Sequence, residues 1–257
     1  MQDKIPPPAG TGREFTEKTK YRYLPRSDQE RGLPQPPLEI SPSPDKPVID
    51  LPEPDAIEVP PLDLRAAIEK RRSIRAYARE PLSIAELAFL LWCTQGVQRT
   101  SGTYATFRTV PSAGARHALE TYLLVNNVAG LEPGLYRYLA LSHRLQQLDT
   151  DPALAVRITE ACLDQQFILR SGVTFLWVAV PYRMTWRYSE RGYRELHKDA
   201  GHACQNLYLA AEAVGCGVCA VAAYDDDAMA GILGIDGVEQ FLIYLATVGK
   251  REGGRGS

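Results

Sequence analysis

Most prolines of this chain lie at its N-terminal end, where residues 1–61 hold fourteen of the nineteen. Proline fixes φ and lacks a backbone N–H, so such a segment should exclude helix and central strand and run extended. It could be a disordered tail or an arm laid across a folded body. The arm is favoured by apolar side chains that a solvated linker would not need, namely Phe15, Tyr21, Tyr23, Leu24, Ile49, Leu51 and Ile57. We therefore expect an extended arm over 1–60, ordered at least over 47–61, and one folded domain over 61–257.

Composition excludes several classes of protein. With 257 residues, 45% of them hydrophobic, the chain can bury one sizeable core. A net charge of −2 and a pI of about 6.1 argue against nucleic acid or an acidic membrane surface as a partner. The N-terminus lacks the apolar stretch of a signal peptide, and no apolar run approaches the length of a membrane span. Five cysteines, an odd number, do not suggest a disulfide framework, so a cytoplasmic protein is expected.

Beyond residue 61 the apolar pattern predicts interleaved helices and strands. Asp63 should cap one helix, and Ser83 with Glu86 forms a capping box for the next. Residues 97–117 are predicted to be a loop. Helices are expected over 63–72, 83–95, 152–165, 196–214 and 226–233, and strands over 120–126, 135–139, 145–148, 173–180, 218–223 and 241–248. Because hairpins occur among the helices, the fold class should be α+β, a mixed sheet flanked by helices.

A short basic run follows the first of these helices. It places the guanidiniums of Arg71, Arg72 and Arg75 beside the hydroxyl of Ser73. Forked donors at this density suit a phosphate or the edge of a flavin ring. A basic helix end is also common as a solvated surface that complements the helix dipole, so the run alone does not decide between the two.

Two other groups of residues could carry chemistry. Cys216 and Cys219 form a C-x-x-C, but no second pair completes a zinc site, and small buried residues between a helix and a strand are the better interpretation. No metal is therefore expected. His202 and Asn206 share a helical face, where they could tie the helix to the body or face a cofactor.

Five motifs in chain order carry a resemblance, although each alone is weak. They are Arg-Arg-Ser-Ile-Arg-Ala-Tyr at 71–77, Pro-Ser-Ala-Gly-Ala-Arg-His at 111–117, the Trp-Arg-Tyr stretch at 186–194, Asp-Ala-Gly-His with Gln-Asn at 199–206, and a glycine-rich turn at 215–224. Together they resemble the flavin-dependent nitroreductase superfamily, in particular its SagB-like dehydrogenase branch, which includes enzymes that oxidise azolines. The resemblance covers about 61–249, and a proline-rich N-terminal arm is usual in this branch.

The resemblance implies bound FMN in an intertwined homodimer. The first motif would contact the phosphate, ribityl chain and pyrimidine edge, and the Pro-Ser-Ala-Gly loop would contact flavin held mainly by the other subunit. The turn after the long helix would lie against the isoalloxazine ring, with a backbone N–H near N5, and the C-terminal group would sit near the phosphate. The implied cofactor-binding residues are Arg71, Arg72, Ser73 and Arg75, then Pro111, Ser112, Ala113 and Gly114, then Ala220, Val221, Ala222 and Ala223, and last Gly249, Lys250 and Arg251.

One position departs from the azoline-oxidising members of the family. They carry a Lys-Tyr pair where this chain has Arg187 and Tyr188, the two candidate catalytic residues. Azoline oxidation must remove a proton as well as a hydride, and arginine cannot be neutral near pH 7 as a buried lysine can. Tyr188 would need strong help to be the base alone. Arg187 could instead orient an anionic substrate.

The sequence therefore predicts an FMN-dependent oxidoreductase that passes hydride through flavin N5 between NADH or NADPH and a small quinone or nitro acceptor. A first alternative is a SagB-like azoline dehydrogenase that acts on a modified peptide beside a cyclodehydratase partner. A second alternative is a non-catalytic scaffold that holds flavin and binds a partner. Neither nucleic acid nor a membrane is expected as a partner.

Overall fold

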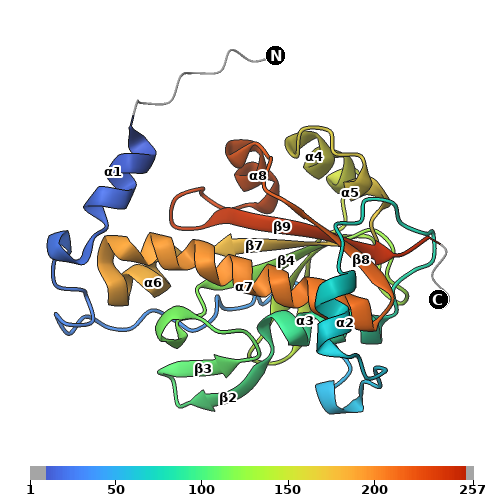
Figure 1. The fold of residues 1–257 in the computed structure, drawn as a ribbon, viewed down its shortest axis with the longest axis horizontal. Helices are drawn as coiled ribbons and strands as arrows, with labels where there is room; N and C mark the ends of the chain where they lie inside the picture. Colours follow the sequence, from blue (N-terminus) through green and yellow to red (C-terminus); the bar gives the residue numbers. More distant parts are fainter. Residues whose placement is uncertain (1–9, 253–257) are drawn as a thin grey trace.

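The structure is a computed structural model that describes residues 10–252, shown in Figure 1. Its strands are β1 (Val48–Asp50), β2 (Val97–Ser101), β3 (Ala105–Arg108), β4 (Leu119–Val125), β5 (Gly134–Leu139), β6 (Arg144–Asp149), β7 (Val173–Ala179), β8 (Cys216–Val221) and β9 (Phe241–Lys250). Its α-helices are α1 (Thr11–Lys18), α2 (Leu64–Lys70), α3 (Ile84–Gln95), α4 (Leu154–Ala161), α5 (Phe167–Arg170), α6 (Pro181–Tyr188), α7 (Gly192–Ala213) and α8 (Asp226–Leu233).

A seven-stranded sheet forms the centre, in the order β1-β6-β5-β4-β7-β9-β8. Every pair of neighbouring strands is antiparallel, so the prediction of a mixed sheet is wrong in this respect while the α+β class is confirmed. The reason lies in the crossover from β7 through α6 and α7: it delivers β8 to the far side of β9 instead of beside β7.

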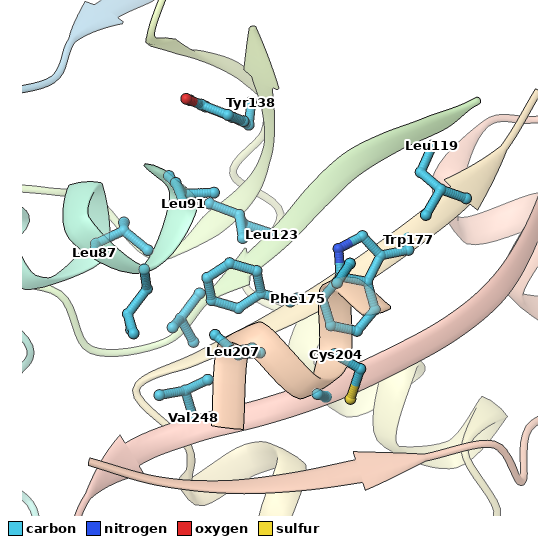
Figure 2. Close-up of a cluster of buried hydrophobic side chains, with 14 of the residues drawn as sticks. Leu87, Leu91, Leu119, Leu123, Tyr138, Phe175, Trp177, Cys204, Leu207 and Val248 are labelled. Carbon is cyan, nitrogen blue, oxygen red and sulfur yellow. The ribbon is translucent and has the colours of Figure 1, made fainter. Parts of the chain in front are cut away.

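Helices cover both faces of this sheet. In Figure 1, α7, α3 and α2 lie on one face, and α4, α5 and α8 lie on the other. The central strands β4 and β7 are buried along their whole length, which explains why most of their side chains are apolar and do not alternate with exposed polar ones. Figure 2 shows the larger core, a buried cluster to which α7 contributes Leu207, α3 contributes Leu87, and β7 contributes Phe175 and Trp177.

Local signals explain the helices that the sequence predicted well. Asp63 accepts a hydrogen bond from the Ala66 amide at 2.8 Å and caps α2. The capping box of α3 is present, because Ser83 and Glu86 each bond to the other's backbone N–H. α8 has the predicted bounds. Among residues 10–252, no helix combines the length and apolar character that a membrane crossing would need.

Several predicted elements need correction. The predicted loop 97–117 contains the antiparallel hairpin of β2 and β3. The helix predicted over 152–165 ends at Ala161, because Leu163 and Asp164 adopt left-handed φ values of 55° and 58°. The long helix α7 starts at Gly192, earlier than expected, and α6 was not predicted at all.

The N-terminal segment is held against the body along α6 and the sheet edge. β1 pairs with β6, and Leu51 is buried beside the larger core. Arg183 donates through Nε to the Pro37 carbonyl at 2.8 Å, and Trp186 donates through Nε1 to the Leu33 carbonyl at 3.0 Å. The expectation that this segment excludes helix is wrong, because α1 forms in the proline-free stretch after residue 9.

Candidate functional site

The basic run leaves α2 and lies along β8. Arg71 caps α2 with ψ at 129°, which turns the chain into an extended path. Ser73 then forms a parallel bridge with Val218, and the Ile74 amide donates to the Val218 carbonyl at 2.9 Å. The first motif and the glycine-rich turn, far apart in the sequence, are therefore neighbours in the fold.

Tyr208 of α7 joins these two segments. Its hydroxyl lies 3.0 Å from Ser73 Oγ and accepts the Ala220 amide at 2.9 Å. The Arg71 guanidinium lies over its ring, 5.3 Å from the centroid. Sequence reasoning missed this residue, because its position beside Leu207 on the inward face of a periodic helix marks only burial.

The three guanidiniums of the basic run lack an acidic partner in the part of the chain that the structure describes. Among residues 10–252, no ion pair includes Arg71, Arg72 or Arg75. Arg72 donates to the carbonyls of Glu69 and Arg71 at 2.8 Å each, and Arg75 lies over the ring of Phe167. Unpaired arginines in one turn, beside a hydroxyl, form a donor set that fits a dianionic phosphate such as that of FMN.

The predicted ring-binding residues 220–223 span the end of β8 and the two residues that follow it. The Ala220 amide is already bonded to Tyr208, and the Val221 side chain is buried in the second core. Ala222 and Ala223 are exposed, and their amides donate no hydrogen bond within residues 10–252. Of the four predicted residues, these two can present backbone donors to a ring.

The C-terminal group is engaged within the chain. The Lys250 ammonium pairs with Glu86 and donates to the Val214 carbonyl at 3.2 Å. Arg251 pairs with Glu212 on α7. Both charges are therefore balanced here, so the phosphate role predicted for these residues would require the ion pairs to open. A Cβ on Gly249 would clash with the ring of Tyr77, which explains the glycine at this position.

The Pro-Ser-Ala-Gly loop is a strained turn held by α7. Gly114, Ala115 and His117 all have positive φ, at 57°, 53° and 44°. The Ala113 amide donates to Asp199 Oδ1 at 3.3 Å. Positive φ in non-glycine residues is uncommon and concentrates at functional sites, where the surrounding structure enforces it.

The candidate catalytic residues pack on this loop. A Cβ built on Gly114 would lie 2.6 Å from the Tyr188 hydroxyl and 2.9 Å from Arg187 Cδ and Nε. Next to them, Ser189 has φ at 47°, a further strained residue. The structure thus brings the second and third motifs together at the end of α6.

Arg116 belongs to the same cluster, although sequence reasoning did not single it out. It is 7% exposed and lies over the ring of Trp186 at 5.5 Å. Burial and the nearby positive charge of Arg187 lower the pKa of Arg116. Two guanidiniums therefore lie close together where the loop meets α6.

One chain does not bring the basic run and the loop together. The run contacts α7 at Tyr208, whereas the loop contacts it at Asp199. Nine residues of helix correspond to about 13 Å along the axis. The two predicted halves of the flavin site therefore lie at different points along α7.

The remaining candidates from the sequence are His202, Asn206 and the two cysteines of the C-x-x-C. Asn206 donates to the Cys93 carbonyl at 2.9 Å and ties α7 to the end of α3, while His202 is exposed. Cys216 and Cys219 are buried free thiols in β8. Within the part of the chain that the structure describes, no cluster of three or more histidine, cysteine or acidic side chains could hold a metal.

Comparison with known proteins decides the family. The nitroreductase family model matches residues 68–250, most of the chain. A Methanocaldococcus jannaschii protein that carries a nitroreductase name is 34% identical over 194 residues, 76% of this chain and 94% of that protein. This chain belongs to the nitroreductase family. The trifolitoxin-processing protein TfxB of Rhizobium leguminosarum bv. trifolii is 33% identical over 142 residues, 52% of this chain and 38% of that protein.

Solved structures share the fold. A nitroreductase-named protein from Ralstonia eutropha matches 86% of this chain and 100% of its own, at 24% identity and a TM-score of 0.66. The E. coli microcin synthetase McbBCD complex with truncated pro-MccB17 matches 93% of this chain and 86% of its own, at 20% identity and a TM-score of 0.58. A nitroreductase-named protein from Desulfovibrio desulfuricans, solved with FMN, matches 77% and 92%, at 18% identity and 0.53. This chain spans 38% of an Anabaena variabilis nitroreductase-named protein, at 30% identity and 0.63.

Proposed function

We propose that this protein is an FMN-dependent oxidoreductase that moves electrons between a nicotinamide donor and a small quinone or nitro acceptor. One observation carries the proposal: three guanidiniums that form no ion pair within residues 10–252 flank Ser73, which Tyr208 ties to Ala220 near the end of β8. Membership of the nitroreductase family supplies the class of reaction. The FMN bound to the Desulfovibrio relative supports the choice of cofactor.

Arg71, Arg72 and Arg75 would hold the FMN phosphate, and Ser73 would bond to the chain that leads to the ring. The free amides of Ala222 and Ala223 would face the ring. When bound, FMN supplies two-electron chemistry at its N5 position. The arginines would balance the charge of the phosphate, and their forked donors suit two-bond contacts to its oxygens.

Arg187 and Tyr188 would act on the acceptor. The Tyr188 hydroxyl can donate a hydrogen bond to a quinone or nitro oxygen. Arg187 remains cationic, so it can orient and stabilise developing negative charge but cannot remove a proton. Their packing on Gly114 holds both side chains at a fixed place on the loop.

A homodimer is part of the proposal. The basic run and the loop contact α7 about 13 Å apart along its axis, so a flavin site that uses both motifs is more simply completed by the loop of a second copy. Sedimentation should give a dimer, and a stable monomer that still binds FMN would contradict this arrangement.

Azoline oxidation is the second candidate. It is favoured by the similarity to the trifolitoxin-processing protein TfxB and to the microcin synthetase complex. A cyclodehydratase would then be the partner. The absence of a lysine beside Tyr188 opposes it, because the reaction needs a base and arginine is not one.

Steady-state assays separate the two candidates. FMN-loaded protein should oxidise NADH or NADPH with menadione or a nitroarene as acceptor, and should oxidise an azoline peptide poorly. Arg187→Lys should raise azoline oxidation if the pocket admits the peptide. Absence of nicotinamide-driven turnover with efficient azoline oxidation by the unchanged protein would overturn the proposal in favour of the second candidate.

A further inference from the structure

A cavity of about 310 Å³ lies where the N-terminal arm crosses the end of α6. The arm side contributes residues between Tyr21 and Glu30, and the other side is Arg187, Tyr188 and Ser189. Ser189 Oγ donates to the Pro25 carbonyl at 3.4 Å, and the Gln29 amide donates to the Trp186 carbonyl at 2.8 Å. The arm is therefore attached on both flanks of an open space that contains the two candidate catalytic residues.

Two neighbouring arginines lie at or next to this cavity, and neither has a counter-ion among the described residues. Within residues 10–252, neither Arg187 nor Arg116 takes part in an ion pair. Arg116 is buried near Arg187, and within residues 10–252 its guanidinium donates only to the carbonyls of Gly114 at 3.1 Å and Tyr104 at 2.9 Å. Like charges held this close are costly unless an anion joins them. Arg26 is the second guanidinium of the cavity lining, beside that of Arg187.

One acidic side chain in the cavity lining, Glu30, limits how much negative charge a bound anion can carry. Glu30 also lines the cavity, and its carboxylate accepts the Ser27 amide at 2.7 Å and the Ser27 hydroxyl at 3.1 Å. These hydrogen bonds lower the pKa of Glu30, so it is negative at neutral pH. A dianionic phosphate would meet this charge, whereas a single carboxylate satisfies the arginines with less repulsion.

We propose that this cavity binds the carboxylate of a small aromatic acceptor, with Arg187 as its forked partner and Tyr188 as a second donor. The inference rests on the proposed function, because it assigns the substrate class of the same site. Planar guanidinium and planar carboxylate match in a two-bond geometry that a lysine cannot supply. The arm then becomes part of the substrate site, since Arg26 and Glu30 close it from the opposite side.

Paired acceptors test the charge preference. In FMN-loaded protein, kcat/KM for 4-nitrobenzoate should exceed that for the neutral 4-nitrobenzamide by about tenfold or more. Arg187→Gln should reduce this ratio about tenfold. The ratio for Arg187→Lys should lie between those of the wild type and Arg187→Gln. Arg157→Gln is the matched control, because Arg157 pairs with Asp151 on the surface of α4 and should leave the ratio unchanged. Equal ratios in the wild type and Arg187→Gln would overturn the inference.

Direct binding gives a readout that does not depend on turnover. Calorimetric titration of FMN-loaded protein with benzoate, without a nicotinamide donor, should show binding that Arg187→Gln weakens about tenfold. Loss of benzoate binding in Arg26→Gln as well would support the role of the arm. No benzoate binding, binding unaffected by Arg187→Gln, or equal competition by inorganic phosphate would each overturn the inference.

The two proposals fail in different ways. Turnover of menadione without any preference for the carboxylate acceptor would reject the anion site and leave the proposed oxidoreductase intact. Benzoate binding that depends on Arg187 in a protein that reduces no acceptor would support the carboxylate site and reject the proposed function.

Discussion

Replacing Gly114 by alanine should separate the role of the loop from simple loss of stability. Gly114 has φ at +57°, and a Cβ there would lie 2.6 Å from the Tyr188 hydroxyl. The hydroxyl would have to move by about 0.8 Å to reach ordinary contact, and Arg187 would also have to shift. The variant therefore displaces both candidate catalytic side chains while leaving their chemistry in place.

The size of the effect follows from two contributions. Alanine in the left-handed region costs roughly 1–2 kcal/mol of folding free energy. A displacement near 1 Å in a catalytic group can cost up to about a hundredfold in rate. We expect Gly114→Ala to lose about 1–2 kcal/mol of stability in urea unfolding and about ten- to a hundredfold in kcat/KM for a quinone acceptor.

Gly130 supplies the control. Its φ is +85°, and nothing lies within 4 Å of a Cβ built on it. Gly130→Ala should therefore lose similar stability with kcat/KM within about twofold of the wild type. Equal activities in the two variants would refute the reasoning that the loop positions Arg187 and Tyr188.

Three further predictions concern the body and the arm. Arg183→Met removes the buried ion-pair partner of Glu120, at 2.6 Å, and leaves only the more distant charge of Arg108 near this carboxylate. The variant should cost about 3–5 kcal/mol in urea unfolding; a loss below about 1 kcal/mol would contradict it. Leu51→Ala should cost about 2–3 kcal/mol and speed native proteolysis through 47–61, whereas unchanged cleavage would argue that the arm is not docked. Burial raises the pKa of Asp199, so its stability contribution is present below the unfolded pKa and lost as pH rises through the folded one. The melting temperature of Asp199→Asn minus that of the wild type should therefore increase from pH 4 to pH 7, and a constant difference would contradict this.

The sequence predicted elements whose signals are local. The capping box at Ser83 and Glu86 sets the start of α3, and the apolar run 175–179 within β7 marks a central strand. The hairpin of β2 and β3 was missed because β2 is polar and largely exposed, without the alternation that marks a strand. α1 was not predicted because prolines lie on both sides of it, although the stretch between those prolines contains none.

Parts of the candidate site could not be found this way. Ser73 and Tyr208 are 135 positions apart and meet only because α2 and β8 both lie against α7. The packing of Arg187 on Gly114 also depends on how the strained loop meets α6. Motifs can list such residues, but contacts between distant segments decide which of them act together.

Binding of FMN through the basic run is the most direct test of the account. Protein purified without denaturation should be yellow, with flavin absorbance corresponding to two FMN per dimer. Arg71→Ala should weaken FMN binding by about 2–4 kcal/mol, measured by flavin fluorescence titration, with little change in the stability of the FMN-free protein. Arg65→Ala is the control, because Arg65 pairs with Glu69 on the exposed face of the same helix. A colourless protein that takes up no added FMN, or full flavin occupancy of Arg71→Ala at low micromolar protein, would contradict the central claim.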